Sequence, residues 1–397
     1  MTSQTRTRRL TFSDRPQDPR WRLRGAALIL GLLLGLLGAE VLLRLLPTTA
    51  SPLVTKRALY RNELRDTYFC YPTNPTGELG PLPDTTQPGW QLQTLSLPPH
   101  EIPLAHLPET PWCVEFHRTN QGLRDDRVYD PLPPAGVLRI AGVGDSFAAG
   151  EGVSLANSLF RQMERQLGPQ FQIVNSALPG LGATDQYSLL RHTVSQLHCP
   201  RAIVVFLIND IALSQPLLDQ QNFLNDLINV RAERLQRADW LAGLARHSRL
   251  VDFLSSRPAL ARVERDTIRW YRNCYEPSYN AENLRKLWRE IADLSRVPNC
   301  EVALVLYPLL EGLRHGYPFQ SIHDRVASVA SEAGLPVLDL AHAFQGMDER
   351  SLWVHPIDHH PNSRAHKIAA SAIVDWLRQE HPAFLTPPPA NVHSPSK

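Results

Sequence analysis

The chain has 397 residues, 43% of them hydrophobic, which is enough for one large or two ordinary domains with a sizeable core. Its net charge of +2 is unevenly distributed, because seven arginines against two aspartates give residues 1–24 a charge of +5 and leave −3 for the remainder. A slightly acidic body has no broad basic footprint, so we expect no nucleic-acid partner.

The basic segment 1–24, which we expect to be a cytoplasmic tail, runs directly into an apolar segment, residues 25–46. These 22 residues are long enough for one membrane-spanning helix. Because a positively charged flank stays in the cytoplasm, we expect a single-pass protein whose remaining body is periplasmic or extracellular. Glu40 and Arg44 are four residues apart, so they share a helix face and are expected to pair near the outer interface.

Two other interpretations of residues 25–46 are a cleaved signal peptide and a buried core helix. Cleavage after Gly38 or Ala39 would leave a leucine at the −3 position, where signal peptidases need a small residue. A soluble core helix is seldom apolar all round. The sequence therefore favours an uncleaved anchor.

Residues 47–135 are rich in proline and show little periodicity, so we expect a spacer and irregular cover. Over residues 136–383, apolar strand patterns alternate with helical ones, which predicts an α/β fold with a parallel sheet covered on both faces. The expected strands are 138–143, 171–175, 202–208, 302–307 and 336–340, and the expected helices are 155–167, 185–197, 321–333 and 363–378.

Residues 211–298 separate the third and fourth strands and are too long for a plain crossover, so they predict a helical insertion. A lid over the site and a packing elaboration remote from it are equally compatible with its composition. The tail 384–397 has the composition of a disordered segment.

Five cysteines in an exported domain allow two disulfides and one free thiol. Cys199 and Cys300 each precede a similar apolar strand, so they could bridge if those strands are parallel neighbours. Cys70 and Cys113 would then form the second pair. Five unpaired thiols, Cys274 among them, are the alternative.

Ser146 is the most informative residue of the chain. It follows the apolar strand 138–143 in the run Gly144-Asp145-Ser146, at the strand end where open α/β folds place their chemistry. This position makes Ser146 a candidate nucleophile. A strand-to-helix turn with a capping Ser or Asp would have the same composition.

A serine nucleophile needs a base, a group that orients the base, and donors for the oxyanion. Each has a candidate after another strand of the predicted sheet. Gly180 follows the second strand, Asn209 follows the third, and Asp358 with His360 follows the last. Asp358 and His360 are two apart and would face the same way in an extended stretch, so the carboxylate can hold the imidazole in the required tautomer.

These four blocks, in this order, resemble the SGNH or GDSL-type hydrolases over residues 120–373, without the insertion. The run Gly122-Leu-Arg124 and the anchor also resemble a membrane-anchored bacterial subgroup. The resemblance implies a flavodoxin-like sheet of order 2-1-3-4-5, Ser146 as nucleophile, His360 as general base and Asp358 as its orienting acid. It further implies an oxyanion hole made of the Ser146 and Gly180 amides and the Asn209 side chain, with no cofactor.

The sequence departs from the family pattern in two places. Ile208 stands where the family often has a glycine before the Asn-Asp pair, and the acid lies two rather than three residues before the histidine. We assign His360 because it precedes Pro361-Asn362, with His359 as the alternative base. Gly182 is the alternative to Gly180.

We therefore predict an extracytoplasmic serine esterase acting on short-chain acyl esters, with carbohydrate-linked esters as one substrate class. An O-acyltransferase acting on envelope polysaccharide would use the same site, because only the acceptor of the acyl group differs. A non-catalytic module that binds glycan or a protein partner is disfavoured by the presence of both Ser146 and His360. A metal cluster of His355, Asp358, His359 and His360 is disfavoured because it would leave Ser146 without a role.

Overall fold

The computed structural model describes residues 20–45, 58–61, 67–71, 74–81, 91–94, 112–211, 239–275, 277–293, 300–356 and 358–387. The chain forms two compact units. The smaller comprises Met1–Thr48 with Gln236–Pro258, and the larger comprises Thr49–Leu235 with Ala259–Lys397.

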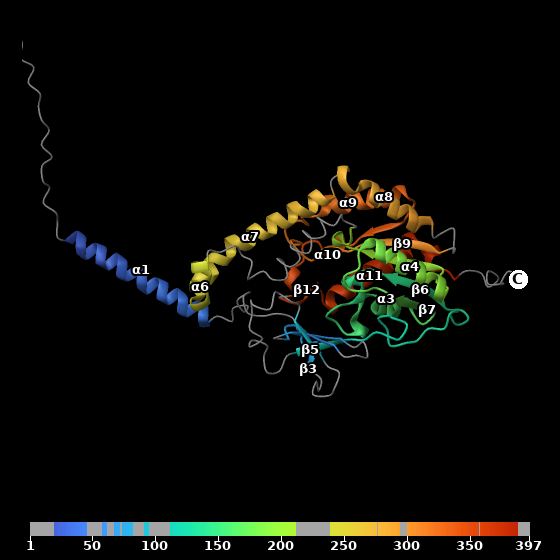
Figure 1. Cartoon of the computed structure of the whole chain (residues 1–397), viewed down its shortest axis with the longest axis horizontal. Coiled ribbons are helices and arrows are strands. Elements are labelled where there is room, and N and C mark those ends of the chain that lie inside the picture. Colours follow the sequence, from blue (N-terminus) through green and yellow to red (C-terminus); the bar gives the residue numbers. More distant parts are fainter. Residues whose placement is uncertain are drawn as a thin grey trace, which may run out of the picture. The chain divides into compact units, whose positions relative to one another are not determined.

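A five-stranded parallel sheet of order β10-β9-β8-β6-β7 forms the centre of the larger unit (Figure 1). Its strands are β6 (Leu138–Val143), β7 (Phe171–Asn175), β8 (Arg201–Phe206), β9 (Glu301–Leu306) and β10 (Val337–Asp339). Numbered along the chain, this order is the predicted 2-1-3-4-5, so the α/β fold class is confirmed. Each of the five predicted strands is present with ends shifted by at most two residues.

Helices cover both faces of this sheet, which explains why its strands read as continuous apolar runs. Successive strand residues alternate between two cores, as Ile140 and Ala141 do. The first core includes α3 (Leu159–Leu167) and α11 (Ser363–Glu380), and the second includes α4 (Ala183–Leu197), α8 (Pro277–Asp293) and α9 (Gln320–Glu332).

The helix ends differ in detail from the prediction. The expected helix 155–167 is interrupted at Ser158, with a 3-10 turn Leu155–Asn157 before α3. The last helix begins at Ser363 as predicted, where Asn362 caps it by accepting a hydrogen bond from the Ala365 amide at 3.0 Å, and it ends at Glu380, two residues later than predicted. The remaining short elements are α2 (Ser146–Ala149), α10 (Ala341–Phe344), β11 (Trp353–His355), β12 (Asp358–Pro361), and 3-10 turns at Ile208–Asp210, Glu349–Ser351 and Pro382–Leu385.

The segment expected to be irregular cover contains a second sheet, antiparallel and of order β3-β5-β2-β1-β4. Its strands are β1 (Ala58–Arg61), β2 (Thr67–Tyr71), β3 (Gly80–Pro81), β4 (Gln91–Thr94) and β5 (Trp112–Phe116). A disulfide between Cys70 and Cys113 joins β2 to β5, and Phe69 and Phe116 pack into the same core as α3 and α11. We call this element the accessory sheet. Residues 47–57, 62–66, 72–73, 82–90 and 95–111 of the expected spacer lie outside the described residues.

The suggested Cys199–Cys300 bridge is absent, although β8 and β9 are parallel neighbours as expected. Both thiols are buried and free, as is that of Cys274. The sulfur of Cys199 is directed at the Leu197 carbonyl and that of Cys300 at the Glu301 carbonyl. Proximity of two strand starts is therefore not sufficient for a bridge, because the side chains must also face each other.

The smaller unit contains α1 (Arg20–Leu45), α6 (Asp239–His247) and the first turns of α7 (Arg249–Cys274). Helix α1 has 26 residues and buries none of them, and it is long and apolar enough to cross a membrane. Arg44 and Glu40 form the expected ion pair at 2.7 Å. Residues 1–19 lie outside the described residues.

The insertion is helical where it is described, in α6, α7 and α8. Trp270, Tyr271 and Trp288 from its second half belong to the second core of the larger unit. Residues 212–238, 276 and 294–298 of the insertion lie outside the described residues. In the tail expected to be disordered, residues 384–387 are described and Phe384 is buried. Residues 388–397 lie outside the described residues.

Candidate active site

A tight turn at the end of β6 presents Ser146. Asp145 caps the short helix α2 by accepting a hydrogen bond from the Phe147 amide at 2.9 Å, and Ser146 is the first residue of that helix. A Cβ at Gly144 would lie 2.5 Å from the Cβ of Ala148 and 2.8 Å from the Val205 carbonyl oxygen. The turn therefore requires glycine at this position, and it raises the Ser146 hydroxyl beyond the edge of the sheet.

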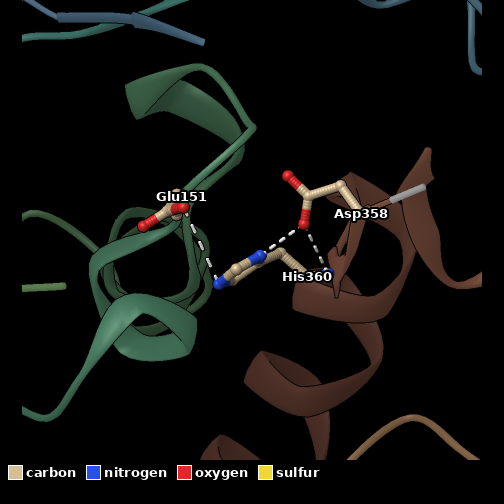
Figure 2. Close-up of side chains that lie close together, drawn as sticks. All are labelled: Glu151, Asp358 and His360. Carbon is tan, nitrogen blue, oxygen red and sulfur yellow. Dashed lines mark hydrogen bonds and ion pairs between the residues drawn. The ribbon is translucent and has the colours of Figure 1, made fainter. Parts of the chain in front are cut away.

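Strand β12 carries a histidine that contacts this hydroxyl and a carboxylate that contacts the histidine. The Nε2 of His360 lies 2.8 Å from the Oγ of Ser146, and its Nδ1 lies 2.5 Å from the Oδ1 of Asp358. Figure 2 shows His360 and Asp358 reaching toward each other from one segment of the chain. The two side chains share a face of the strand because they are two residues apart. The structure thus brings together the nucleophile, base and acid candidates of the sequence.

The alternative base and the alternative metal cluster both depend on His359, which lies elsewhere. Its Nδ1 pairs with Glu311, and its ring stacks on Trp353 with centroids 3.6 Å apart. His355 stacks on Tyr71, with centroids 5.3 Å apart. Because these imidazoles have separate partners, the four predicted ligands do not converge on one point.

The candidate oxyanion donors follow the neighbouring strands β7 and β8. The loop that contains Gly180 is held to the nucleophile turn by a 3.1 Å hydrogen bond from the Leu178 amide to the Gly144 carbonyl. Gly180 has a φ of 79°, a conformation that favours glycine, whereas the alternative Gly182 has a φ of −81° and precedes α4. Asn209 lies in the 3-10 turn after β8, and its side chain donates a hydrogen bond to Asp145.

Asp145 and Asp210 are buried carboxyl groups in the turns that carry Ser146 and Asn209. Burial raises the pKa of Asp145 to about 6, and burial together with the charge of Asp145 raises the pKa of Asp210. Both accept backbone hydrogen bonds, Asp145 from Phe147 and Asp210 from Leu207 at 2.8 Å. These hydrogen bonds fix the two turns that carry Ser146 and Asn209 after β6 and β8.

Glu151 is a site residue that the sequence analysis missed. Its side chain comes from the segment after α2, and its Oε1 lies 3.8 Å from His360 Nε2 (Figure 2). The residue is only 4% exposed, so a buried carboxyl group lies beside the imidazole. The ligand atoms of Glu151, Asp358 and His360 lie within 4.8 Å of one another, but both imidazole nitrogens already face Ser146 and Asp358.

Residues 143–368, more than half of the chain, match the model of the GDSL-like lipase/acylhydrolase family. The chain belongs to this family. Membership in this family makes the chain an ester-hydrolysing enzyme. The matched range includes the candidate nucleophile, base and acid.

Solved structures of similar proteins include two described as lipolytic proteins of the G-D-S-L family. A putative lipolytic protein of the G-D-S-L family from Desulfitobacterium hafniense DCB-2 is 14% identical, with a TM-score of 0.36 over 60% of this chain and 98% of that one. A lipase/acylhydrolase from Enterococcus faecalis is 15% identical, with a TM-score of 0.35 over 61% and 96%. A putative arylesterase from Agrobacterium tumefaciens str. C58 is 12% identical, with a TM-score of 0.35 over 61% and 99%. No curated protein matches the chain.

The accessory sheet of this GDSL-like acylhydrolase reaches the candidate triad directly. The hydroxyl of Tyr71, at the end of β2, donates a 2.8 Å hydrogen bond to the Oδ2 of Asp358. Tyr71 is fully buried and adjoins the disulfide-bonded Cys70. No local pattern in the sequence identifies this tyrosine, because its partner lies 287 residues away.

Arg124 connects the same sheet to the loop after the nucleophile. Its guanidinium donates hydrogen bonds to the carbonyls of Glu115 and Val153, both at 3.1 Å, and lies over the ring of Phe116. Burial lowers the pKa of this arginine to about 10. The Gly-Leu-Arg run noticed in the sequence thus has a structural role, which is to hold the accessory sheet against the active-site loops.

Proposed function

We propose that this GDSL-like acylhydrolase is a membrane-anchored, extracytoplasmic serine esterase that uses Ser146, His360 and Asp358. One observation carries the proposal: His360 lies between the hydroxyl of Ser146 at 2.8 Å and the carboxylate of Asp358 at 2.5 Å. These distances allow one imidazole to accept the serine proton while it donates its own Nδ1 proton to the acid.

In the first half of the reaction, Ser146 Oγ attacks the ester carbonyl carbon and its proton passes to His360 Nε2. The negative charge that develops on the carbonyl oxygen is stabilised by the amides of Ser146 and Gly180 and by the Asn209 side chain. His360 then gives its proton to the leaving alkoxide, the ester C–O bond breaks, and an acyl-enzyme and an alcohol remain.

In the second half, water takes the place of the alcohol. His360 removes a proton from the water as it attacks the acyl carbon, and then returns that proton to Ser146 Oγ as the carboxylic acid leaves. The carboxylate of Asp358 stabilises the imidazolium in both halves, and the Glu151 side chain lies 3.8 Å from Nε2 on the other side of the ring. No cofactor takes part in this sequence of steps.

Helix α1 supports the location that we propose. Its apolar part follows the strongly basic segment 1–24, which favours a cytoplasmic N-terminus and an exported catalytic domain. The Cys70–Cys113 disulfide agrees with an oxidising compartment. Short-chain acyl esters of envelope carbohydrates are the substrates that we propose for an esterase in this place.

Labelling with a fluorophosphonate tests the nucleophile. The probe should label the purified full-length enzyme, and Ser146→Ala should abolish both the label and the hydrolysis of aryl esters. Ser176→Ala is a matched control, because that serine lies at the end of the next strand, where its hydroxyl donates to the Gly142 carbonyl at 3.0 Å. A labelled S146A enzyme, or an unlabelled wild type, would refute the assignment.

A further inference from the structure

Helix α6 and the first turns of α7 expose large apolar side chains to solvent. Trp240 and Leu244 are 67% and 52% exposed, and their spacing of four residues places them on one face of α6. Leu254 in α7 is 60% exposed and adjoins the partly exposed Phe253. Exposed apolar side chains gathered in this way in a soluble environment indicate a surface that contacts something apolar.

The end of α6 and the start of α7 form hydrogen bonds with Glu40 and Arg44 of α1. The carboxylate of Glu40 accepts hydrogen bonds from the amides of Arg249 and Leu250, at 3.0 and 2.8 Å, and from the Ser248 hydroxyl at 2.8 Å. It therefore satisfies the free N–H groups at the start of α7. Arg44, which pairs with Glu40, donates a 2.9 Å hydrogen bond to the His247 carbonyl at the end of α6. Figure 1 shows α6 at the C-terminal end of α1.

The position of Glu40 along α1 sets the depth of this junction. Arg24 and Glu40 are sixteen positions apart, and at 1.5 Å per residue the helix between them spans about 24 Å, less than the roughly 30 Å of a bilayer's hydrocarbon core. With Arg24 at the cytoplasmic boundary, Glu40 lies close to the outer boundary of the core. A carboxylate at that depth needs partners, and the start of α7, Ser248 and Arg44 supply them.

We propose that α6 and the first turns of α7 lie in the membrane–water interface on the extracytoplasmic side of the bilayer that α1 crosses, with Trp240 and Leu244 inserted among the lipids. The inference rests on the membrane anchor of the proposed function. Tryptophan is the residue that such interfaces favour, because its ring is apolar while its N–H stays hydrated. The helical insertion of this hydrolase then has a role that is neither a lid nor remote packing: its first part is a second attachment to the bilayer, next to the anchor.

A fluorescent probe at position 244 tests the insertion. Full-length Leu244→Cys protein, labelled with an environment-sensitive fluorophore, is reconstituted into phosphatidylcholine–phosphatidylglycerol vesicles with or without lipid-attached nitroxides. The free native cysteines Cys199, Cys274 and Cys300 are buried and should not react. Leu132→Cys is the matched control, because Leu132 is a 53% exposed leucine of the larger unit.

We expect the probe at 244 to show blue-shifted emission and loss of fluorescence with nitroxide lipids, and the probe at 132 to show neither. Introducing Glu40→Ala should reduce the quenching at 244 while the protein still floats with the vesicles. A floating protein whose probe at 244 behaves like that at 132 would overturn the inference and leave the anchor intact. A blue shift without quenching would also overturn it, since it means a protein contact. Wild-type protein that does not float would instead refute the anchor.

Discussion

Tyr71 connects the accessory sheet to Asp358 of the candidate triad. Its hydroxyl occupies one oxygen of Asp358, and His360 occupies the other. A carboxylate held at both oxygens cannot rotate away from the imidazole, so we propose that Tyr71 is a positioning residue for His360, the proposed base. Its ring is also fixed, because it stacks on His355 and is fully buried.

We expect Tyr71→Phe to lower kcat about tenfold with KM little changed, because a hydrogen bond to a charged group contributes about 1.5 to 3 kcal/mol and each 1.4 kcal/mol is tenfold in rate. Tyr68→Phe is the control, since Tyr68 belongs to the same strand but to its other face. Steady-state kinetics on an aryl ester would measure the effect. An equal loss in both variants would indicate a general disturbance of β2 rather than a role for the Tyr71 hydroxyl.

His366, in the first turn of α11, is a buried histidine with no hydrogen-bond partner for either ring nitrogen among the described residues. Burial lowers its pKa to about 3, and burial lowers that of His355 to about 4. Between about pH 6.5 and these folded-state pKa values, the unfolded chain binds the protons and the folded chain does not. The free energy of unfolding should therefore fall by about 1.4 kcal/mol per pH unit for each histidine as the pH drops below 6.5.

His366→Leu should flatten this dependence and leave stability at neutral pH equal or higher, because an unsatisfied polar ring is replaced by an apolar side chain. Urea denaturation between about pH 7 and pH 5 would measure the slopes. His342→Leu, at an exposed position, should keep the wild-type slope. If the H366L and wild-type slopes agree, His366 does not remain neutral in the folded protein.

At the scale of elements, the conformation of the turn after β7 distinguishes Gly180 from Gly182 as the proposed oxyanion donor. A Cβ added at Gly180 would meet nothing within 4 Å, but the φ of 79° penalises any other residue. We expect Gly180→Ala to lower kcat about tenfold by displacing the turn, a loss of about 1.4 kcal/mol of transition-state stabilisation. Gly182→Ala should retain wild-type kinetics, because its φ is ordinary and its Cβ would lie 3.6 Å from the Asp210 carbonyl oxygen. The opposite result would mean that the amide of Gly182, and not that of Gly180, is the oxyanion donor.

The central sheet and the strand-end residues were predictable because their signals are local. An apolar run followed by glycine and a polar residue, as around Ser146, identifies both the strand and the site. The accessory sheet was missed because its strands are short, lie between proline-rich segments and pair across long intervals, as Cys70 does with Cys113. Tyr71 and Glu151 were missed for a related reason: a single polar residue carries no period, and only the folded chain shows what it faces.

At the scale of the whole molecule, the disulfide and the apolar helix α1 both bear on which side of the membrane the catalytic domain lies. The Cys70–Cys113 bond joins two neighbouring strands of the accessory sheet next to Tyr71, so it holds β2 and β5 together beside the triad. Such a bond persists in an oxidising compartment and is reduced in the cytoplasm. For the proposed anchor, we therefore expect the orientation to affect the integrity of the catalytic domain as well as its access to substrate.

We expect the catalytic domain of the cell-expressed protein to be exported, as the basic flank of α1 predicts. Protease added to spheroplasts should then degrade the body and leave only a short anchor fragment. Cys70 and Cys113 should resist alkylation under denaturing conditions until a reductant is added, whereas Cys199, Cys274 and Cys300 should react at once. Replacing Arg20, Arg22 and Arg24 by glutamate should weaken the orientation and leave a share of molecules with five reactive thiols. A wild-type body that is protected from protease and fully reduced would reverse the topology.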